Sequence, residues 1–300
     1  MAAVTGASAR ALAWRDAEVA PRSYFGEVRG RFLRNRAGVA ALCVLVVLTL
    51  GAIAGPFLIA ADPLVGQATQ RLLPIGSTGH LLGTDELGRD MLSRLVYGGR
   101  VSLITGLLPV ALATFVGTLI GATAGYIRGY VGSLMMRTMD MFYALPAIML
   151  AIAISASLGP GVENSIIAIS CVFIPPLARV AEAATRQVVH LEYIEAARAS
   201  GANTWQILTR QILANIFNPI FVYASGLVGL SIVIASGLSF LGLGSAPPQP
   251  EWGYMLNSLR GAIYTQPWVA VLPGFLIFAT SMACNIVSDA LRDALDIKEA

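Results

Sequence analysis

Few side chains in this sequence could carry out chemistry. The single lysine bears on whether the chain itself can bind ATP. Lys298 is the only lysine in 300 residues. A phosphate-binding loop of the Walker A type places a lysine between glycine and Ser or Thr, where its ammonium group contacts nucleotide phosphates. Because no such lysine is present, we expect that the chain does not bind ATP by this device.

The cysteines and histidines are too scattered for a metal or disulfide site. Each of the cysteines, Cys43, Cys171 and Cys284, lies in a different apolar run, and neither His80 nor His190 has a second ligand at metal-site spacing. Zinc sites and disulfide frameworks show close, regular spacing of such residues. The apolar runs also hold no pairing of a nucleophile with a base. We therefore expect packing cysteines, no metal and no enzyme.

Composition indicates the kind of scaffold that holds these residues. Hydrophobic residues make up 56% of the chain and charged residues 12%, whereas charged residues approach a quarter of a soluble domain. The sequence predicts an all-α polytopic membrane protein with six transmembrane helices. The expected spans are residues 38–61, 101–126, 141–158, 165–180, 219–241 and 269–287.

The apolar cores of these spans contain no Asp, Glu, Lys or His. Transporters coupled to protons or sodium usually keep such groups at membrane depth, because a buried carboxylate is costly and is retained for ion binding or relay. An ion-coupled secondary transporter is therefore disfavoured. A channel or receptor subunit agrees with the composition, but neither explains the polar segment that follows the fourth span.

That polar segment, residues 190–218, is the only long polar helical run between hydrophobic spans. Residues 192–200 are good helix formers, and Glu195 stands three positions before Arg198, at the spacing of a helical ion pair. Gly201 follows as a typical left-handed cap. The pattern predicts a short first helix that ends at Gly201.

A second helix is predicted to follow directly, capped by Asn203 or Thr204. Its apolar residues at helical spacing are Trp205, Leu208 and Ile212. The simplest alternative is a hairpin that only packs, and a DNA-reading helix-turn-helix is another. Arg198 and Arg210 are its only strong cations, too few to hold a phosphate backbone, so no nucleic acid is expected.

The spacing of small residues in this hairpin resembles the EAA loop of ABC importer permeases. Glu195-Ala196-Ala197 is followed after three residues by Gly201 and after ten more by Ile212-Leu213. The resemblance implies that an ATP-binding partner is contacted by Glu195, Ala196, Ala197, Ser200 and Gly201. The peptide-transporter version usually continues Ile-Leu-Pro-Asn, but Ala214 stands in place of that proline, so the second helix can run unkinked.

Two loops resemble those of peptide and nickel importer permeases. The first loop carries Gly83-Thr84-Asp85, Gly88-Arg89-Asp90, Ser93-Arg94 and Gly99-Arg100. The second carries Phe240-Leu241-Gly242-Leu243-Gly244, Pro247-Pro248, Pro250 and Trp252-Gly253, with Trp252 expected as an interfacial anchor. The C-terminal segment resembles that of the C-type subunit, and the resemblance extends from about Phe32 to Lys298.

Further local features are expected from residue spacing. Leu87, Met91, Leu92, Leu95 and Val96 share one face of a predicted surface helix. Gly117, Gly121 and Gly125 recur every four residues, which favours close helix packing. Asp140 is expected to open the third span, Pro146 to kink it, and Pro175-Pro176 to break the last turns of the fourth.

Cation counts predict the orientation. With the hairpin and both termini on the cytoplasmic side of a bacterial inner membrane, fifteen of the 20 Lys and Arg residues fall on the cytoplasmic side and five on the outer side. The predicted parts are a cytoplasmic tail with an interfacial basic helix (1–37), a first span (38–61) and an external loop with an amphipathic helix (62–100). A permease core (101–287) follows, which includes the hairpin (190–218) and an external loop (242–268), before a cytoplasmic tail (288–300).

The resemblance implies a function and a set of partners. The chain would form half of an ATP-driven path for di- or oligopeptides, with nickel or glutathione as alternative substrates of the same family. Its partners would be the lipid bilayer, a companion permease subunit, two ATP-binding subunits or one fused chain, and an external substrate-binding protein. ATP and Mg²⁺ would then bind to the partners, and this chain would hold no cofactor.

Overall fold

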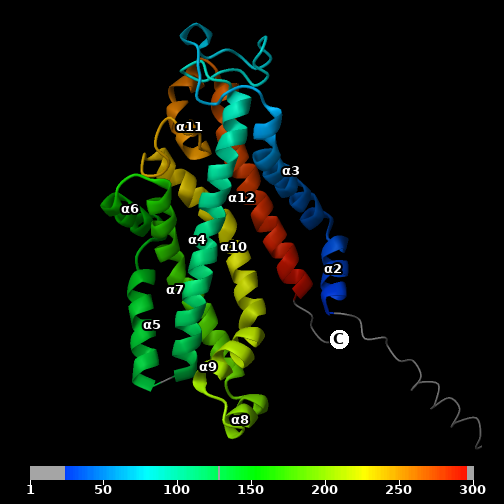
Figure 1. Ribbon diagram of the computed structural model, residues 1–300, viewed down its shortest axis with the longest axis vertical. Helices are drawn as coiled ribbons and strands as arrows, with labels where there is room; N and C mark the ends of the chain where they lie inside the picture. The colour runs from blue at the N-terminus through cyan, green and yellow to red at the C-terminus, as the bar shows by residue number, and fades with distance from the viewer. Residues whose placement is uncertain (1–23, 128, 296–300) are drawn as a thin grey trace, which may run out of the picture.

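The computed structural model describes residues 24–127 and 129–295, and this part of the chain is built from helices (Figure 1). The α-helices are α2 (Tyr24–Arg34), α3 (Arg36–Leu58), α4 (Met91–Ile127), α5 (Gly129–Tyr143), α6 (Ala147–Leu158), α7 (Val162–Val188), α8 (Glu192–Ala199), α9 (Thr204–Gln206), α10 (Leu213–Phe240), α11 (Trp252–Ser258) and α12 (Pro267–Leu295). Three short turns join them: η1 (Ala68–Gln70), the π-helical η2 (Ile207–Ile212) and η3 (Gly261–Tyr264). Pairing of β type in the described residues is limited to isolated bridges within residues 66–90, which confirms the all-α class.

Among the described residues, five helices are long and apolar enough to cross a membrane, and the bent pair of α5 and α6 supplies a sixth if counted as one span. The five are Arg36–Leu58, Met91–Ile127, Val162–Val188, Thr204–Phe240 and Pro267–Leu295. The helices do not coincide with the expected spans: residues 59–61 lie beyond the end of α3, and α12 (Pro267–Leu295) continues past residue 287 to Leu295. The basic helix expected after Ser23 is α2, while the tails at 1–23 and 296–300 lie outside the described residues.

The surface helix expected within residues 62–100 is not a separate element. Leu87 precedes the first turn of α4 and is exposed, whereas Met91 and Leu95 are buried in it. Both pack with Trp252 in a small apolar cluster, so these turns belong to the bundle rather than to a membrane surface. α4 therefore begins ten residues before the expected span and runs unbroken to Ile127.

Trp252 is a packing residue and not the interfacial anchor that the sequence suggested. Its side chain is 2% exposed, and its indole Nε1 donates a hydrogen bond to the carbonyl oxygen of Leu95 at 2.8 Å. Gly99 makes room for the ring, since a Cβ there would lie 3.0 Å from indole Cζ2. The indole thereby joins the start of α11 to the first turns of α4.

The third expected span is broken into two helices. α5 and α6 meet at 90°, and Pro146 stands immediately before α6. A proline disfavours helical backbone in the residue before it, here Leu145, which explains a break sharper than the expected kink. Asp140 lies near the end of α5 rather than opening a span, and its carboxylate pairs with Arg179 of α7.

α7 remains helical through Pro175 and Pro176, so the expected break there is wrong. Both prolines are buried where α7 packs along α4, and this packing holds the helix although each proline removes one backbone donor. The expected glycine face lines the contact. A Cβ at Gly121 would lie 2.1 Å from the Ala178 carbonyl oxygen, so the two backbones approach directly.

The main apolar core joins the bundle to the hairpin after α7. It contains buried residues of α4, α7 and α10, and it also includes Ile194, Ile207 and Ile212. All three of these hairpin isoleucines are at most 1% exposed. The hairpin is therefore anchored in the same core as the long helices.

Candidate functional site

The hairpin lies at the end of the bundle opposite the loop of residues 59–90 (Figure 1). α8 forms its first helix, and its second runs from α9 through η2 into α10 without interruption. Thr204–Phe240 is one helical rod of 37 residues, about 55 Å long at 1.5 Å per residue. The helix thus passes without a break through residue 218, the expected end of the hairpin, and with Ala214 in place of a proline it continues as expected.

The turn after α8 is a Schellman motif. The amide of Ala202 donates to the carbonyl of Ala197 at 3.1 Å, and that of Gly201 to Arg198 at 3.0 Å, which satisfies carbonyls that the helix end leaves unpaired. Gly201 has φ +82°, a conformation that a side chain disfavours by about 1 kcal/mol. A Cβ at this position would meet no atom within 4 Å, so backbone conformation, not space within the chain, selects glycine.

The second helix begins with a capping box at Asn203. Its side chain accepts a hydrogen bond from the amide of Gln206 at 2.9 Å, and Gln206 Oε1 accepts one from the amide of Asn203 at 3.0 Å. Of the two caps that the sequence offered, the structure uses Asn203. The reciprocal bonds satisfy two amides at the helix start and fix the angle of the turn.

One turn of this second helix is a π-helix, which the sequence pattern did not predict. The amide of Leu213 donates to the carbonyl of Leu208, five residues back. This bond places residues five apart on adjacent turns, so that Ile207 and Ile212 both face the core. Trp205, which shares helical spacing with Leu208 and Ile212, is 67% exposed and does not join them in the core.

The predicted coupling residues lie mostly on the outer face of the hairpin. Glu195, Ala196, Ser200 and Gly201 are exposed, whereas Ala197 is half-buried and packs against the core. Three of the exposed four are small, which leaves a low surface over the turn. Their contact with an ATP-binding partner stays a prediction.

Arg198 does not form the helical ion pair that its spacing from Glu195 suggested. Its guanidinium carbon lies 5.1 Å from the centroid of the Tyr126 ring, over its face. Tyr126 belongs to the last turn of α4, so this cation–π contact ties α8 to α4. Glu195 is exposed and forms no ion pair with any residue of 24–127 or 129–295.

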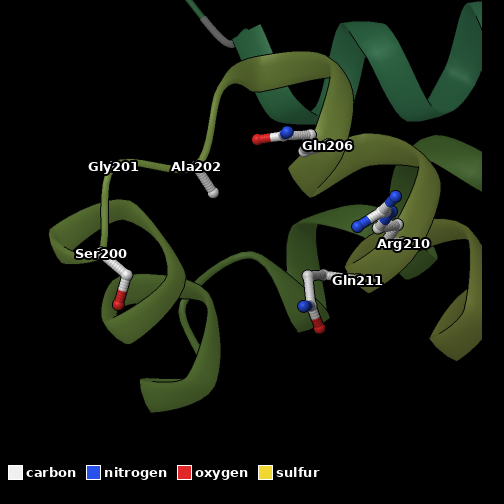
Figure 2. Close-up of a pocket in the computed structure, with 6 residues that line it drawn as sticks. All are labelled: Ser200, Gly201, Ala202, Gln206, Arg210 and Gln211. Carbon is white, nitrogen blue, oxygen red and sulfur yellow. The ribbon is translucent and has the colours of Figure 1, made fainter.

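A pocket of about 260 Å³ opens between the end of α8 and the second helix. Figure 2 shows its lining side chains directed into one space from both sides of the turn. The lining residues are Ser200, Gly201, Ala202, Gln206, Arg210 and Gln211. Ser200 and Gly201 belong to the predicted coupling set, and Arg210 was noted in the sequence only as a cation of the hairpin. Ala202, Gln206 and Gln211 were not singled out.

The opposite end of the bundle holds a charged network that is structural. The Asp85 carboxylate, 2% exposed, accepts from Arg89 Nε at 2.7 Å and lies 3.2 Å from Arg94 Nε. Asp90 pairs with His80 at 2.9 Å and accepts from the amide of Ser93 at 2.8 Å, which caps α4. These groups bond to one another within the fold, so they order the 59–90 loop.

Two family models match the described chain on either side of residues 75–116. The family described as "Binding-protein-dependent transport system inner membrane component" matches residues 117–298. The "N-terminal TM domain of oligopeptide transport permease C" matches residues 23–74. The first match contains the hairpin, and the second contains α2 and α3.

Relatives and solved structures agree with these matches. "Glutathione transport system permease protein GsiD" of Pectobacterium atrosepticum is 42% identical, covering 95% of this chain and 94% of that protein. "Di/tripeptide transport system permease protein DppC" of Pseudomonas aeruginosa is 40% identical, covering 89% and 90%. A structure of the MetNI methionine ABC transporter in an inward-facing conformation superposes with a TM-score of 0.52 at 17% identity, covering 67% of this chain and 97% of that one.

Proposed function

Because the chain belongs to the family of binding-protein-dependent transport system inner membrane components, as a permease subunit of its peptide and glutathione importer branch, we propose that it forms half of an import path for short peptides. The relatives above are named for glutathione and for di- and tripeptides, and another, "Probable D,D-dipeptide transport system permease protein DdpC" of Escherichia coli, is 37% identical over 87% of each chain. Small peptides are common to all three names, which supports a peptide over nickel.

The proposed partners are a companion permease subunit, ATP-binding subunits and an external substrate-binding protein. ATP and Mg²⁺ bind to the ATP-binding subunits in this proposal, because this chain has no lysine for a phosphate loop. Hydrolysis there supplies the free energy for transport, and this chain converts it into movement.

The hairpin carries that conversion. The observation that most supports this coupling role is that the hairpin has an exposed outer face of small residues and a buried inner face. Ala196, Ser200 and Gly201 leave the outside low enough for another protein to approach, while Ile194 and Ile207 fix the inside to the bundle. A partner that moves the hairpin therefore also moves the rod Thr204–Phe240, and the spans alternate between inward-open and outward-open states.

Trp205 adds a candidate anchor to this docking surface. Its indole is 67% exposed on the hairpin, and tryptophan is among the residue types enriched at the energetic centres of protein interfaces. A neighbouring subunit that covers it would bury a large apolar ring. The proposed docking face thus combines small residues at the turn with one large anchor beside it.

We place the hairpin end of the bundle in the bacterial cytoplasm. With α5 and α6 counted as one span, the helices make an even number of passes, so α2 and the end of α12 share the hairpin's side. Most cations fall on that side, which agrees with the positive-inside rule. Of the outer arginines, Arg89 and Arg94 contact Asp85, and Arg100 donates to backbone carbonyls.

Cross-linking tests the docking directly. A variant without Cys43, Cys171 and Cys284 receives one cysteine at Ser200 and is assembled with its ATP-binding subunits carrying single cysteines along their cleft. We expect a disulfide between the two chains that forms or breaks with nucleotide. The proposal would be contradicted if residue 200 formed no cross-link while a cysteine at the opposite end of the bundle cross-linked efficiently to the same subunits.

A further inference from the structure

The pocket beside Gly201 has the size of a site for a side chain. Its volume of about 260 Å³ lies below the range of about 300–1,000 Å³ that small-molecule sites occupy. It opens on the outer surface of the hairpin, where the exposed faces of α8 and of the second helix meet (Figure 2). A residue of a docked protein can enter it from outside.

Hydrogen-bond donors dominate the lining of this pocket. Gln206 uses its Oε1 to accept from Asn203, so its side-chain NH₂ group remains as the donor. Gln211 contributes a second amide, and the Arg210 guanidinium contributes up to five N–H donors. No Asp or Glu lines the pocket, and the one formal charge in it is positive.

That positive charge is not neutralised by the chain itself. Arg210 is exposed, and within residues 24–127 and 129–295 no carboxylate forms an ion pair with it. It lies in the π-helical turn between Ile207 and Ile212, both of which face the core, and its guanidinium lies on the same side of the helix as Gln206 (Figure 2). The fold therefore presents a guanidinium and two amides to an external acceptor.

We propose that this pocket receives the carboxylate of an Asp or Glu side chain from the ATP-binding subunit. The proposal rests on the docking role of the hairpin and adds the chemistry of one contact. A carboxylate binds a guanidinium through two parallel hydrogen bonds, and its remaining lone pairs accept from the neighbouring amides. Burial of the pair at the docked surface excludes water and makes the contact specific for an acidic residue.

Three substitutions test this chemistry without disturbing the fold. Arg210→Gln removes the charge at an exposed site, and Gln206→Glu keeps the Oε1 acceptor of the capping box but replaces the amide donor with a negative oxygen. Gln187→Glu is the matched control, because it also changes the net charge by one unit at an exposed position near the hairpin but outside the pocket. The measurement is the dissociation constant between the permease pair and its purified ATP-binding subunits, at low and high salt.

We expect Arg210→Gln and Gln206→Glu to weaken binding at least tenfold at low salt, and Gln187→Glu to change it less than twofold. A Lys substitution for an acidic residue of the ATP-binding subunit should weaken binding to the unmodified chain, and Arg210→Glu should restore it. Equal binding by all three variants would overturn the pocket's role. If Ala196→Arg abolished binding in that case, docking through the hairpin would stand and only the carboxylate contact would fall.

Discussion

The guanidinium of Arg100 donates a hydrogen bond from Nε to the carbonyl oxygen of Ala52 at 2.7 Å. Ala52 lies in α3, four residues before Pro56, and a proline has no amide to complete the helical bond at that carbonyl. A second bond joins Nη2 to the carbonyl of Ile53 at 2.7 Å. Arg100 of α4 thus supplies a donor that α3 lacks, within the apolar part of the molecule.

This relationship predicts coupled effects of two substitutions. Arg100→Leu leaves the Ala52 carbonyl without a donor in a membrane helix, which should cost about 1–3 kcal/mol of stability. Pro56→Ala restores an amide at position 56. In an Arg100→Leu background it should therefore recover part of the loss. Thermal unfolding of the detergent-solubilised parent, the two single variants and the double variant measures the stability of each. Strictly additive effects of the two changes would show that the Ala52 carbonyl needs no external donor.

Contacts of this kind explain why the distribution of cations in the sequence supported the predicted membrane orientation only in part. Four of the five outer arginines lie in one stretch of the sequence: Arg71, Arg89, Arg94 and Arg100. Three of these bond to Asp85 or to backbone carbonyls. A count by sequence treats them as free charges, because the partners come from other segments and cannot be read from spacing.

Gly201 allows the conformational and docking requirements to be separated. Gly201→Ala should cost about 1 kcal/mol because φ is +82° there. Asparagine tolerates left-handed backbone better, so Gly201→Asn should fold more like the parent. It nevertheless adds bulk to the open surface over the turn. We expect Gly201→Asn to match the parent in thermal stability but to lose ATPase coupling, whereas full activity would show that only the cap matters.

Orientation can be tested by thiol labelling in intact cells. Ala199 is exposed on α8 and its side chain has no capping role, unlike that of Asn203, and Gln249 is exposed in the loop after α10. In a background without native cysteines, Gln249→Cys should react with an impermeant maleimide and Ala199→Cys should not. Both should react after permeabilisation. Labelling of position 199 alone in intact cells would show the reverse orientation.

Local signals predicted the hairpin well, because they depend on neighbouring residues. The cap at Gly201, the capping residue Asn203 and the close contact at Gly121 each follow from residue type at a fixed spacing. The membrane class could also be predicted from the composition, and the helices could be predicted from the apolar runs in the sequence.

Features that depend on distant partners were not predictable. The π-helical turn brings Ile207 and Ile212, five residues apart, to the same buried face, whereas α-helical spacing does not pair them. Trp252 is buried because α4 has a glycine beside it, far away in sequence. The pocket at Arg210 arises only when two helices meet at the turn, so its lining residues could not be grouped in advance.

The central claim is that the outer face of the hairpin couples this permease to its ATP-binding subunits, and one substitution tests it most directly. Ala196 is exposed on α8, so the chain itself has room for a longer side chain there, and arginine is a good helix former. Ala196→Arg should leave the protein inserted and paired with its companion subunit, which co-purification measures. Peptide uptake and substrate-stimulated ATPase activity in the reconstituted complex should fall tenfold or more, the factor that a loss of about 1.4 kcal/mol at the docking surface produces. Uptake at the unmodified rate would contradict the account and leave the hairpin as a packing element.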